Sequence, residues 1–297
     1  MTAHNNGKSV IIKEETVKKQ RGRRVFLPFL ISSIKKSIKI MKEHNFLKLT
    51  LFLFLFGFLA YAGNRAKTSV DEETALTESF ERTEDLRADV IEELSKDAAG
   101  FDIDIDVDFD KLHDVNTDIM AWLYVPDTYL SFPVLKERTL LEYYYLDHDY
   151  TGAKQWAGAV FTPAEPTGIT DAHLLLFGHH TRREEIAFSN LYELYGTKEE
   201  SLKHTYAYLL YPDRTERYEL WCAVESTSED AVYEIPYQAG SDSYEKLLEE
   251  IKGKASYMNG DMPGNEDQTL VLSTCNGAAG GKERFYVVFR KEGVEIQ

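Results

Sequence analysis

The chain has 297 residues, which is enough to bury a substantial hydrophobic core in one or two domains. Its formal net charge of −16 is unevenly distributed: residues 1–48 hold 12 Lys and Arg against 3 Glu, whereas the remainder holds 22 against 47 Asp and Glu. Because the acidic part has no basic stripe that could neutralise phosphates, the composition argues against nucleic-acid binding.

The two parts meet at an apolar stretch, residues 46–63. No residue between Leu49 and Ala62 is charged, and most are Leu or Phe. The stretch can span a bilayer if its first residues extend it and the Lys48 amine reaches the interface. The basic excess precedes it, so the positive-inside rule places the N-terminus in the cytoplasm and exports the rest. We therefore predict a cytoplasmic basic segment at 1–45 and a single-pass anchor in the cell membrane at 46–63.

Two other interpretations of this stretch exist. Ala60-Tyr61-Ala62 matches the small-x-small pattern of signal-peptide cleavage, but the preceding region is too long for a signal peptide unless translation begins at Met41 rather than Met1. A buried core helix would show a polar face, which is missing here. We favour an uncleaved anchor, and the sequence leaves the start site and cleavage after Ala62 open.

The next segment is polar and acidic. Residues 66–99 are rich in Glu and Leu and predict one or two helices closed by Gly100. Residues 101–110, FDIDIDVDFD, alternate strictly and predict a strand with an acidic face. A calcium loop is an alternative, because the first three aspartates have the right early spacing, although the Gly and Glu expected later in such a loop are missing. We assign 64–107 to an extracellular helical and acidic linker.

Short apolar runs separated by turn signals dominate the rest of the chain and predict strands. The runs are a pair around Pro126-Asp127 (119–136), strands at 157–163 and 173–180, a hairpin about Pro212-Asp213 (205–226), an amphipathic helix within 241–258, and strands at 268–275 and 284–291. Seven or eight strands with one substantial late helix indicate a mainly β fold, a β-barrel with helical additions.

The chain has only two cysteines, Cys222 and Cys275, whereas secreted domains stapled by disulfides are cysteine-dense. A single Cys222–Cys275 bridge is one interpretation. The other is one buried thiol and one chemically useful thiol.

Cys275 ends an apolar run, and Arg284 begins the next one after a glycine-rich turn. If these runs pair antiparallel, the two residues face each other across the strand ends. A thiolate is a nucleophile, and Arg is a permanent forked donor suited to the oxyanion that forms when a carbonyl is attacked. The alternative is that Arg284 simply pairs with an acidic neighbour.

A histidine must supply the acid or base. His179 and His180 follow LLLFG, where a buried strand breaks at Gly178 and opens into a polar segment, and residues at strand exits lie at the rim of a barrel. His4 and His44 lie on the cytoplasmic side of the predicted anchor, and we interpret His113, His148, His173 and His204 as surface or packing residues. The candidate constellation is Cys275, His179 and Arg284.

These motifs resemble the sortase family. TLVLSTC at 269–275 is similar to the sortase signature that ends in Thr-Cys, the Arg nine positions later heads the next strand as in sortases, and LLLFGHH resembles their strand-Gly-His element. Residues 115–134 and 143–152, with the helix at 243–257 before the cysteine strand, resemble class B in particular. Asn276 departs from the acidic residue of some class B members.

The resemblance covers about 110–292 and implies a catalytic domain at 108–292. It implies a sortase-type closed β-barrel of seven to eight strands, with N-terminal helices and one long helix before the cysteine-bearing strand. The implied activity is that of a membrane-anchored cysteine transpeptidase. Such an enzyme cleaves a C-terminal sorting signal of exported proteins after Thr and passes the acyl group to an amine of a peptidoglycan precursor or a pilin lysine.

The resemblance assigns roles to three residues: Cys275 as nucleophile, His179 as general acid/base, and Arg284 as oxyanion or substrate stabiliser. Ser273 and Thr274, which flank the nucleophile, and His180 are candidate substrate contacts, and strand packing explains Ser273 and Thr274 equally well. It implies no cofactor and no metal. The alternatives are a secreted thiol peptidase that hydrolyses its acyl-enzyme, and a non-catalytic surface module held by a Cys222–Cys275 disulfide.

Overall fold

The computed structural model describes residues 8–93, 101, 103–137, 143–163, 172–181, 183–275 and 281–296, with side chains described from residue 31 except that of residue 41. The chain forms two compact units, Met1–Val70 and Asp71–Gln297. The helices are α1 (Lys8–Val90), α2 (Phe109–Val115), η2 (Tyr144–Leu146), α3 (Leu191–Tyr195), α4 (Lys198–Ser201), η3 (Ala231–Tyr233) and α5 (Asp242–Lys254). The strands are β1 (Ile91–Glu93), β2 (Ile105–Val107), β3 (Ile119–Tyr124), β4 (Ser131–Lys136), β5 (Val160–Thr162), β6 (His173–Phe177), β7 (Tyr206–Leu210), β8 (Arg214–Thr227), β9 (Tyr257–Met258), β10 (Thr269–Cys275) and β11 (Glu283–Ile296).

The first unit is helical. In the described part of the chain, one helix is long and apolar enough to cross a membrane, and none of its apolar window is buried by protein. The side chains of this window, including Phe54 and Leu55, are exposed. A buried core helix, one of the alternatives for residues 46–63, is therefore not what the chain forms.

The helix predicted to end at Gly100 ends earlier, at Val90. Residues 91–93 form β1, which pairs antiparallel with β2 in the register Ile91 with Val107 and Glu93 with Ile105. Gly100 itself lies outside the described residues. The pairing satisfies backbone groups that a longer helix would have used within itself, and Val90, the last residue of α1, is buried in the cluster that also contains Ile105 and Val107.

The strand predicted at 101–110 is correct in its alternation but too long. Ile105 and Val107 are buried and Asp106 is exposed, as a period of two requires. The strand ends because Asp108 caps α2: its carboxylate accepts a hydrogen bond from the Lys111 amide at 3.1 Å. The Tyr124 hydroxyl donates to the Asp104 carboxylate at 2.7 Å, and no group of three potential metal ligands exists among the described residues.

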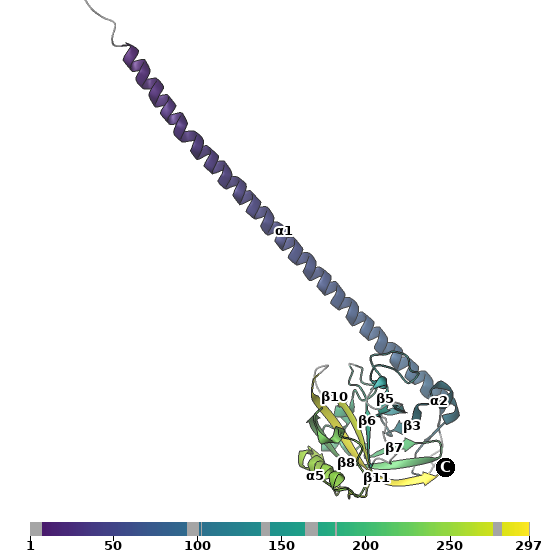
Figure 1. Ribbon diagram of the computed structural model, residues 1–297. Helices are drawn as coiled ribbons and strands as arrows, with labels where there is room; N and C mark the ends of the chain where they lie inside the picture. Colours follow the sequence, from purple (N-terminus) through teal and green to yellow (C-terminus); the bar gives the residue numbers. More distant parts are fainter. Residues whose placement is uncertain are drawn as a thin grey trace, which may run out of the picture. The chain divides into compact units, whose positions relative to one another are not determined.

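The strands of the second unit close into a barrel (Figure 1). The sheet order is β11-β10-β6-β5-β4-β3-β7-β8-β9, and an additional pairing of β11 with β8 closes the ring, so eight strands form the barrel and β9 is appended. The prediction of a closed, mainly β barrel of seven to eight strands is confirmed. Every strand run expected between 119 and 291 is present, most of them shorter than the run.

Hydrophobic side chains fill the barrel and also its outer face beside α5. Leu123, Leu176 and Leu272 belong to the interior cluster, and each is completely buried. The helix α5 begins at the Ser241 cap, as its sequence predicted, and packs Tyr244 and other apolar side chains against β8, β10 and β11. This helix keeps the cysteine strand β10 covered on its outer face.

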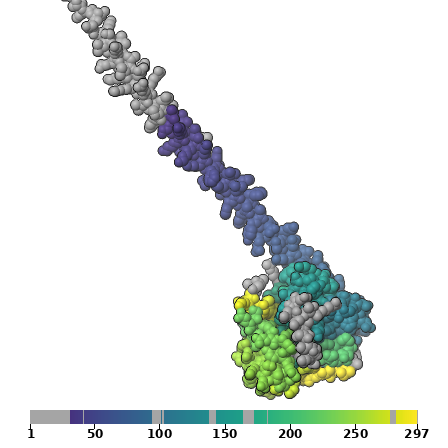
Figure 2. Space-filling model, viewed as in Figure 1, coloured from purple at the N-terminus to yellow at the C-terminus, as the bar shows by residue number. Residues whose placement is uncertain are grey.

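The last part of α1 belongs to the second unit. Leu76 lies in the interior cluster, the Gln155 amide donates to the Ala75 carbonyl at 2.9 Å, and Arg82 pairs with Asp149 at 2.6 Å. The described residues of 71–107, most of the predicted linker, thus pack with the predicted catalytic domain. Figure 2 shows teal, green and yellow segments on one face of this unit, because strands far apart in the sequence are neighbours in the barrel.

Candidate active site

The candidate site is built where two parallel strands end together. β6 and β10 are paired up to Phe177 and Ser273. Beyond that point the Gly178 amide donates to the Ser273 carbonyl at 3.1 Å, and the Thr274 hydroxyl donates to the Gly178 carbonyl at 2.8 Å. These bonds hold the exit of β6, and therefore His179, beside the end of the cysteine strand.

The third residue comes from the neighbouring antiparallel strand. β10 and β11 pair in a register that sets Cys275 directly opposite Arg284. On its other side β11 pairs with β8, where Arg284 lies opposite Ser226. Cys275 and Arg284 thus face each other across the strands, as their spacing predicted, and Arg284 lies on a strand that is paired on both sides.

All three residues line one cavity of about 250 Å³. Its walls are Tyr143, Leu146, Phe161, Phe177, Gly178, His179, Ser228, Tyr233, Ser273, Thr274, Cys275 and Arg284. A concave, largely apolar pocket with a few convergent polar groups is the usual form of a ligand site. His180 is exposed and is not one of the described residues that line the cavity.

The two cysteines are free thiols in different surroundings. Cys275 is half-buried at the cavity, whereas Cys222 is completely buried on β8, opposite Val288. Burial raises the pKa of the Cys222 thiol well above its ordinary value. The disulfide alternative is therefore not realised, and only Cys275 is placed to react.

His179 is oriented by a backbone carbonyl. Its Nε2 donates to the Leu146 oxygen at 2.6 Å, which fixes the tautomer, and Nδ1 forms no hydrogen bond to any described residue. Burial lowers the His179 pKa, and the Leu146 carbonyl and the Asp147 carboxylate oppose that effect. The ring is thus held neutral with one nitrogen left for chemistry.

Arg284 is held by carbonyls rather than by an acid. Its Nη1 donates to the Gly281 and Glu283 carbonyls, each at 2.9 Å. It forms no ion pair with a carboxylate of the described residues, and its Nε and Nη2 form no hydrogen bond among them. An acidic partner for Arg284 is therefore not observed, and two nitrogens of the guanidinium are available to a substrate.

The chain is similar to known proteins in sequence and in fold, although no family model matches it. Sortase B of Listeria monocytogenes is 25% identical over 241 residues, 80% of this chain and 92% of its own length, and sortase B of Staphylococcus aureus is 25% identical over 188 residues, 62% of this chain and 73% of its own. The fold matches the solved sortase B of Clostridium perfringens with a TM-score of 0.56, 22% identity and coverage of 63% of this chain and all of that one. It matches sortase B of B. anthracis with a TM-score of 0.57, 22% identity and coverage of 74% and 99%.

In sequence and in fold the chain resembles class B sortases. It is thus an enzyme of the cysteine transpeptidase type, whose general function is the anchoring of proteins to the cell wall.

Several residues at the sortase cavity carry no signal in the sequence. The Tyr233 hydroxyl lies 2.9 Å from the Ser273 hydroxyl, and burial raises the Tyr233 pKa to about 12. Tyr233 belongs to η3, whose start is capped by the Asp230 carboxylate, itself paired with Lys254 at 2.9 Å. This chain of contacts, which reaches α5, helps to place the tyrosine at the cavity.

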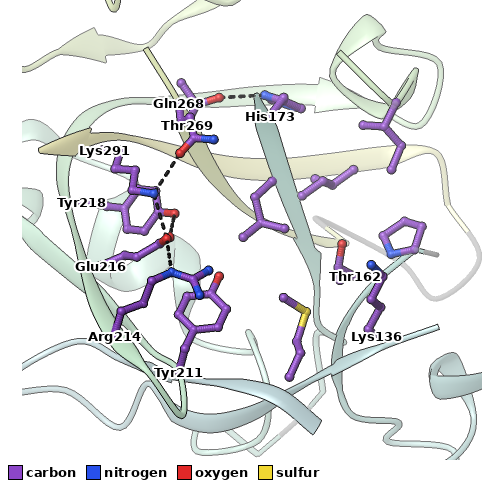
Figure 3. Close-up of a pocket in the computed structure, with 15 residues that line it drawn as sticks. Lys136, Thr162, His173, Tyr211, Arg214, Glu216, Tyr218, Gln268, Thr269 and Lys291 are labelled. Carbon is purple, nitrogen blue, oxygen red and sulfur yellow. Dashed lines mark hydrogen bonds and ion pairs between the residues drawn. The ribbon is translucent and has the colours of Figure 1, made fainter. Parts of the chain in front are cut away.

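A second cavity, of about 300 Å³, lies at the other end of β6 and β10 (Figure 3). Glu216 is central to it: its carboxylate pairs with Lys291 at 2.8 Å and Arg214 at 2.9 Å, and accepts from the Tyr218 hydroxyl at 2.6 Å. His173 also lines this cavity and is completely buried. None of the described lining residues is a cysteine, so the cavity near Cys275 is the candidate active site.

Proposed function

We propose that this chain is a membrane-anchored sortase that cleaves a C-terminal sorting signal after Thr and transfers the acyl group to an amine. The observation that carries the proposal is the convergence of Cys275, His179 and Arg284 on one cavity, from the ends of three adjacent strands. The three residues are 96 and 9 positions apart along the chain, yet each is aimed at the same space.

In the proposed mechanism, Cys275 supplies the nucleophile and His179 handles the proton. The thiol proton moves to Nδ1 of His179, since Nε2 is already engaged with the Leu146 carbonyl. The thiolate attacks the Thr carbonyl of the signal. The imidazolium then protonates the nitrogen of the leaving amine as the C–N bond breaks, leaving a thioacyl enzyme.

Arg284 stabilises the oxyanion of the tetrahedral intermediate. Its Nη1 bonds to the Gly281 and Glu283 carbonyls hold the guanidinium at the cavity wall, and Nε and Nη2 remain as donors for the oxyanion. Preorganised donors of this kind cost no reorganisation when charge develops. Ser273 and Thr274 line the cavity beside them, although their hydroxyls bond to Tyr233 and to the Gly178 carbonyl.

The acceptor is an amine of a peptidoglycan precursor or a pilin lysine. Among relatives, sortase B of Staphylococcus aureus has been solved as a substrate complex, and a sortase B structure has been solved in complex with triglycine. These structures support a peptide signal and an amine as the two partners of this chain.

The location we propose is the outer face of a membrane. Residues 46–63 form the anchor, 1–45 lie in the cytoplasm, and the unit that begins at Asp71 is exported. The apolar helix and the positive charge that precedes it support this orientation. Anchoring would confine the enzyme to the surface where exported substrates and lipid-linked acceptors meet.

The test is to trap the thioacyl adduct. The full chain in detergent is incubated with a panel of sorting peptides, with and without triglycine, and products are read by mass spectrometry. We expect an adduct on Cys275, a peptide–glycine product when the amine is present, and no adduct in Cys275→Ala. Arg284→Ala should lower kcat about 10²- to 10³-fold, the usual cost of losing an oxyanion donor.

Cys222→Ala is the matched control, because it removes the other thiol far from the cavity and should leave turnover nearly unchanged. Equal loss of activity in both cysteine variants would contradict the assignment of the nucleophile. Release of free acid that triglycine never diverts would identify a thiol peptidase instead of a transpeptidase.

A further inference from the structure

The ring of His179 is held by a short turn whose position depends on one glycine. We propose that the turn Tyr144–Leu146, seated against Gly158, is a positioning device that presents Nδ1 of His179 to the reacting groups. The proposal rests on the proposed function, because it assigns the proton transfer to His179. It adds Tyr145 and Gly158 as positioning residues, which are not among the described residues that line the cavity and which act through the His179 ring.

The first observation is the bond at the ring itself. The Leu146 carbonyl can only accept, so the 2.6 Å contact requires a proton on Nε2 of His179. The same carbonyl oxygen faces the positive charge of the imidazolium when Nδ1 takes the thiol proton. One contact therefore selects the tautomer, fixes the ring plane and stabilises the charged form.

The second observation is the packing of Gly158 under this contact. Gly158 has a φ of +63°, and a Cβ at this position would lie 2.7 Å from the Leu146 and Tyr145 oxygens and 3.0 Å from Cδ2 of His179. Contacts under 3.0 Å with backbone atoms require the backbone to shift. Only glycine lets the turn and the histidine ring approach each other this closely.

The third observation is the anchoring of the turn from its other side. The Tyr145 hydroxyl donates to Asp118 at 2.6 Å and accepts from the Asn116 amide at 3.0 Å, and the side chain is 2% exposed. The Tyr145 amide donates to the buried Glu137 carboxylate at 3.0 Å, and its carbonyl accepts from the Ala159 amide at 3.0 Å. The carbonyl that meets the ring thus comes from a turn that is tied to the barrel wall at four points.

The protons balance through this arrangement. The S–H bond of Cys275 breaks as N–H forms at Nδ1, and that proton later passes to the leaving amine as the C–N bond breaks. Nε2 keeps its proton throughout, on the Leu146 oxygen. Without the device the ring could rotate by half a turn, exchange its nitrogens and present a proton where a lone pair is needed.

The experiment compares two glycines of the same loop in the full chain in detergent. Gly158→Ala introduces the clash, whereas Gly152→Ala introduces a similar positive-φ strain, with φ of +81°, but its nearest contact is the Tyr144 hydroxyl at an ordinary 3.6 Å. We expect kcat of Gly158→Ala to fall about 10²-fold, the effect of a small misplacement of a catalytic group, with KM little changed. Gly152→Ala should retain nearly the wild-type kcat.

The second readout is the tautomer of His179, from the ¹⁵N shifts of its imidazole. The wild-type chain should show neutral His179 protonated at Nε2, and Gly158→Ala should show a mixture of tautomers. Tyr145→Phe, which removes two anchors without adding atoms, should shift both kcat and the tautomer in the same direction to a smaller extent. A merely structural role would lower stability without changing the tautomer.

Equal kcat for the two glycine variants, with the wild-type tautomer in both, would overturn the proposal. If Gly158→Ala does not fold, the test is Tyr145→Phe. A Tyr145→Phe variant with the same kcat and the same His179 tautomer as the wild type would also overturn the proposal. A wild-type chain that forms no thioacyl adduct would instead refute the proposed function, and the tautomer measurement would still test the turn.

Discussion

Stability should depend on pH through His173, the first residue of β6, which is completely buried. Its Nε2 donates to the Val232 carbonyl at 3.2 Å, and its Nδ1 lies 3.0 Å from the Thr269 hydroxyl. The Tyr237 ring packs edge-on against it, with centroids 5.7 Å apart. Burial lowers the His173 pKa from 6.5 to about 4, so the folded chain keeps this ring neutral.

Protonation of His173 is linked to unfolding, because the folded and unfolded chains bind its proton with different affinities. Between pH 6.5 and about 4 the unfolded chain binds a proton at His173 that the folded chain does not bind. The unfolding free energy therefore increases with pH in this window; the contribution is complete above pH 6.5 and is lost as the pH falls toward 4. One pKa unit corresponds to 1.36 kcal/mol, so this residue alone should cost about 3 kcal/mol across the window.

The assay is urea unfolding of residues 71–297 at half-unit steps of pH, followed by fluorescence of the buried Trp122 and Trp221. His173→Gln retains an N–H donor toward Val232 but cannot titrate. Its unfolding free energy should therefore change by about 3 kcal/mol less than that of the wild type over this pH window. The lowered pKa of His179 adds a slope of the same sign to both proteins. Parallel pH profiles for wild type and variant would refute the reasoning, whatever their offset.

Three further outcomes are expected. Iodoacetamide should modify Cys275 quickly and Cys222 only after unfolding, because burial raises the Cys222 pKa; mass mapping of the alkylated chain checks this. The acid limb of kcat/KM should lie below pH 6.5, because burial lowers the His179 pKa and activity is lost once that ring is protonated in the free enzyme; a limb above 6.5 in the pH–rate profile would contradict this. A chain shortened to begin at residue 108 should unfold at lower urea than one beginning at 71, since it loses several buried side chains worth about 2 kcal/mol each, and equal midpoints would show that residues 71–107 are dispensable.

The sequence predicted those features that depend on neighbours along the chain. Alternating apolar residues and turn signals located the strands, because side chains on a strand point alternately to opposite faces. The opposition of Cys275 and Arg284 was also predictable, since two runs joined by a short turn pair antiparallel and the spacing then sets the register. The strand exit at Gly178 marked His179 for the same local reason.

Features that depend on distant contacts were mispredicted or not predicted. Residues 91–93 look helical from their neighbours but pair with β2, so the end of α1 came ten residues earlier than expected. The start of α2 was taken for strand, because the alternation continues through Phe109 although Asp108 caps a helix there. The segment before the barrel was taken for a linker, because nothing in its composition shows that Leu76 enters the core.

What the sequence by itself determined is the class of fold and the opposition of Cys275 and Arg284, because strand periodicity and hairpin register act over a few residues. Only the tertiary structure decided how the histidine is held. The Leu146 carbonyl lies 33 residues before His179, and Gly158 matters because of the space left between them. Such contacts arise when the closed barrel brings separate loops to one rim, and no local pattern of side chains records a bond made by the backbone.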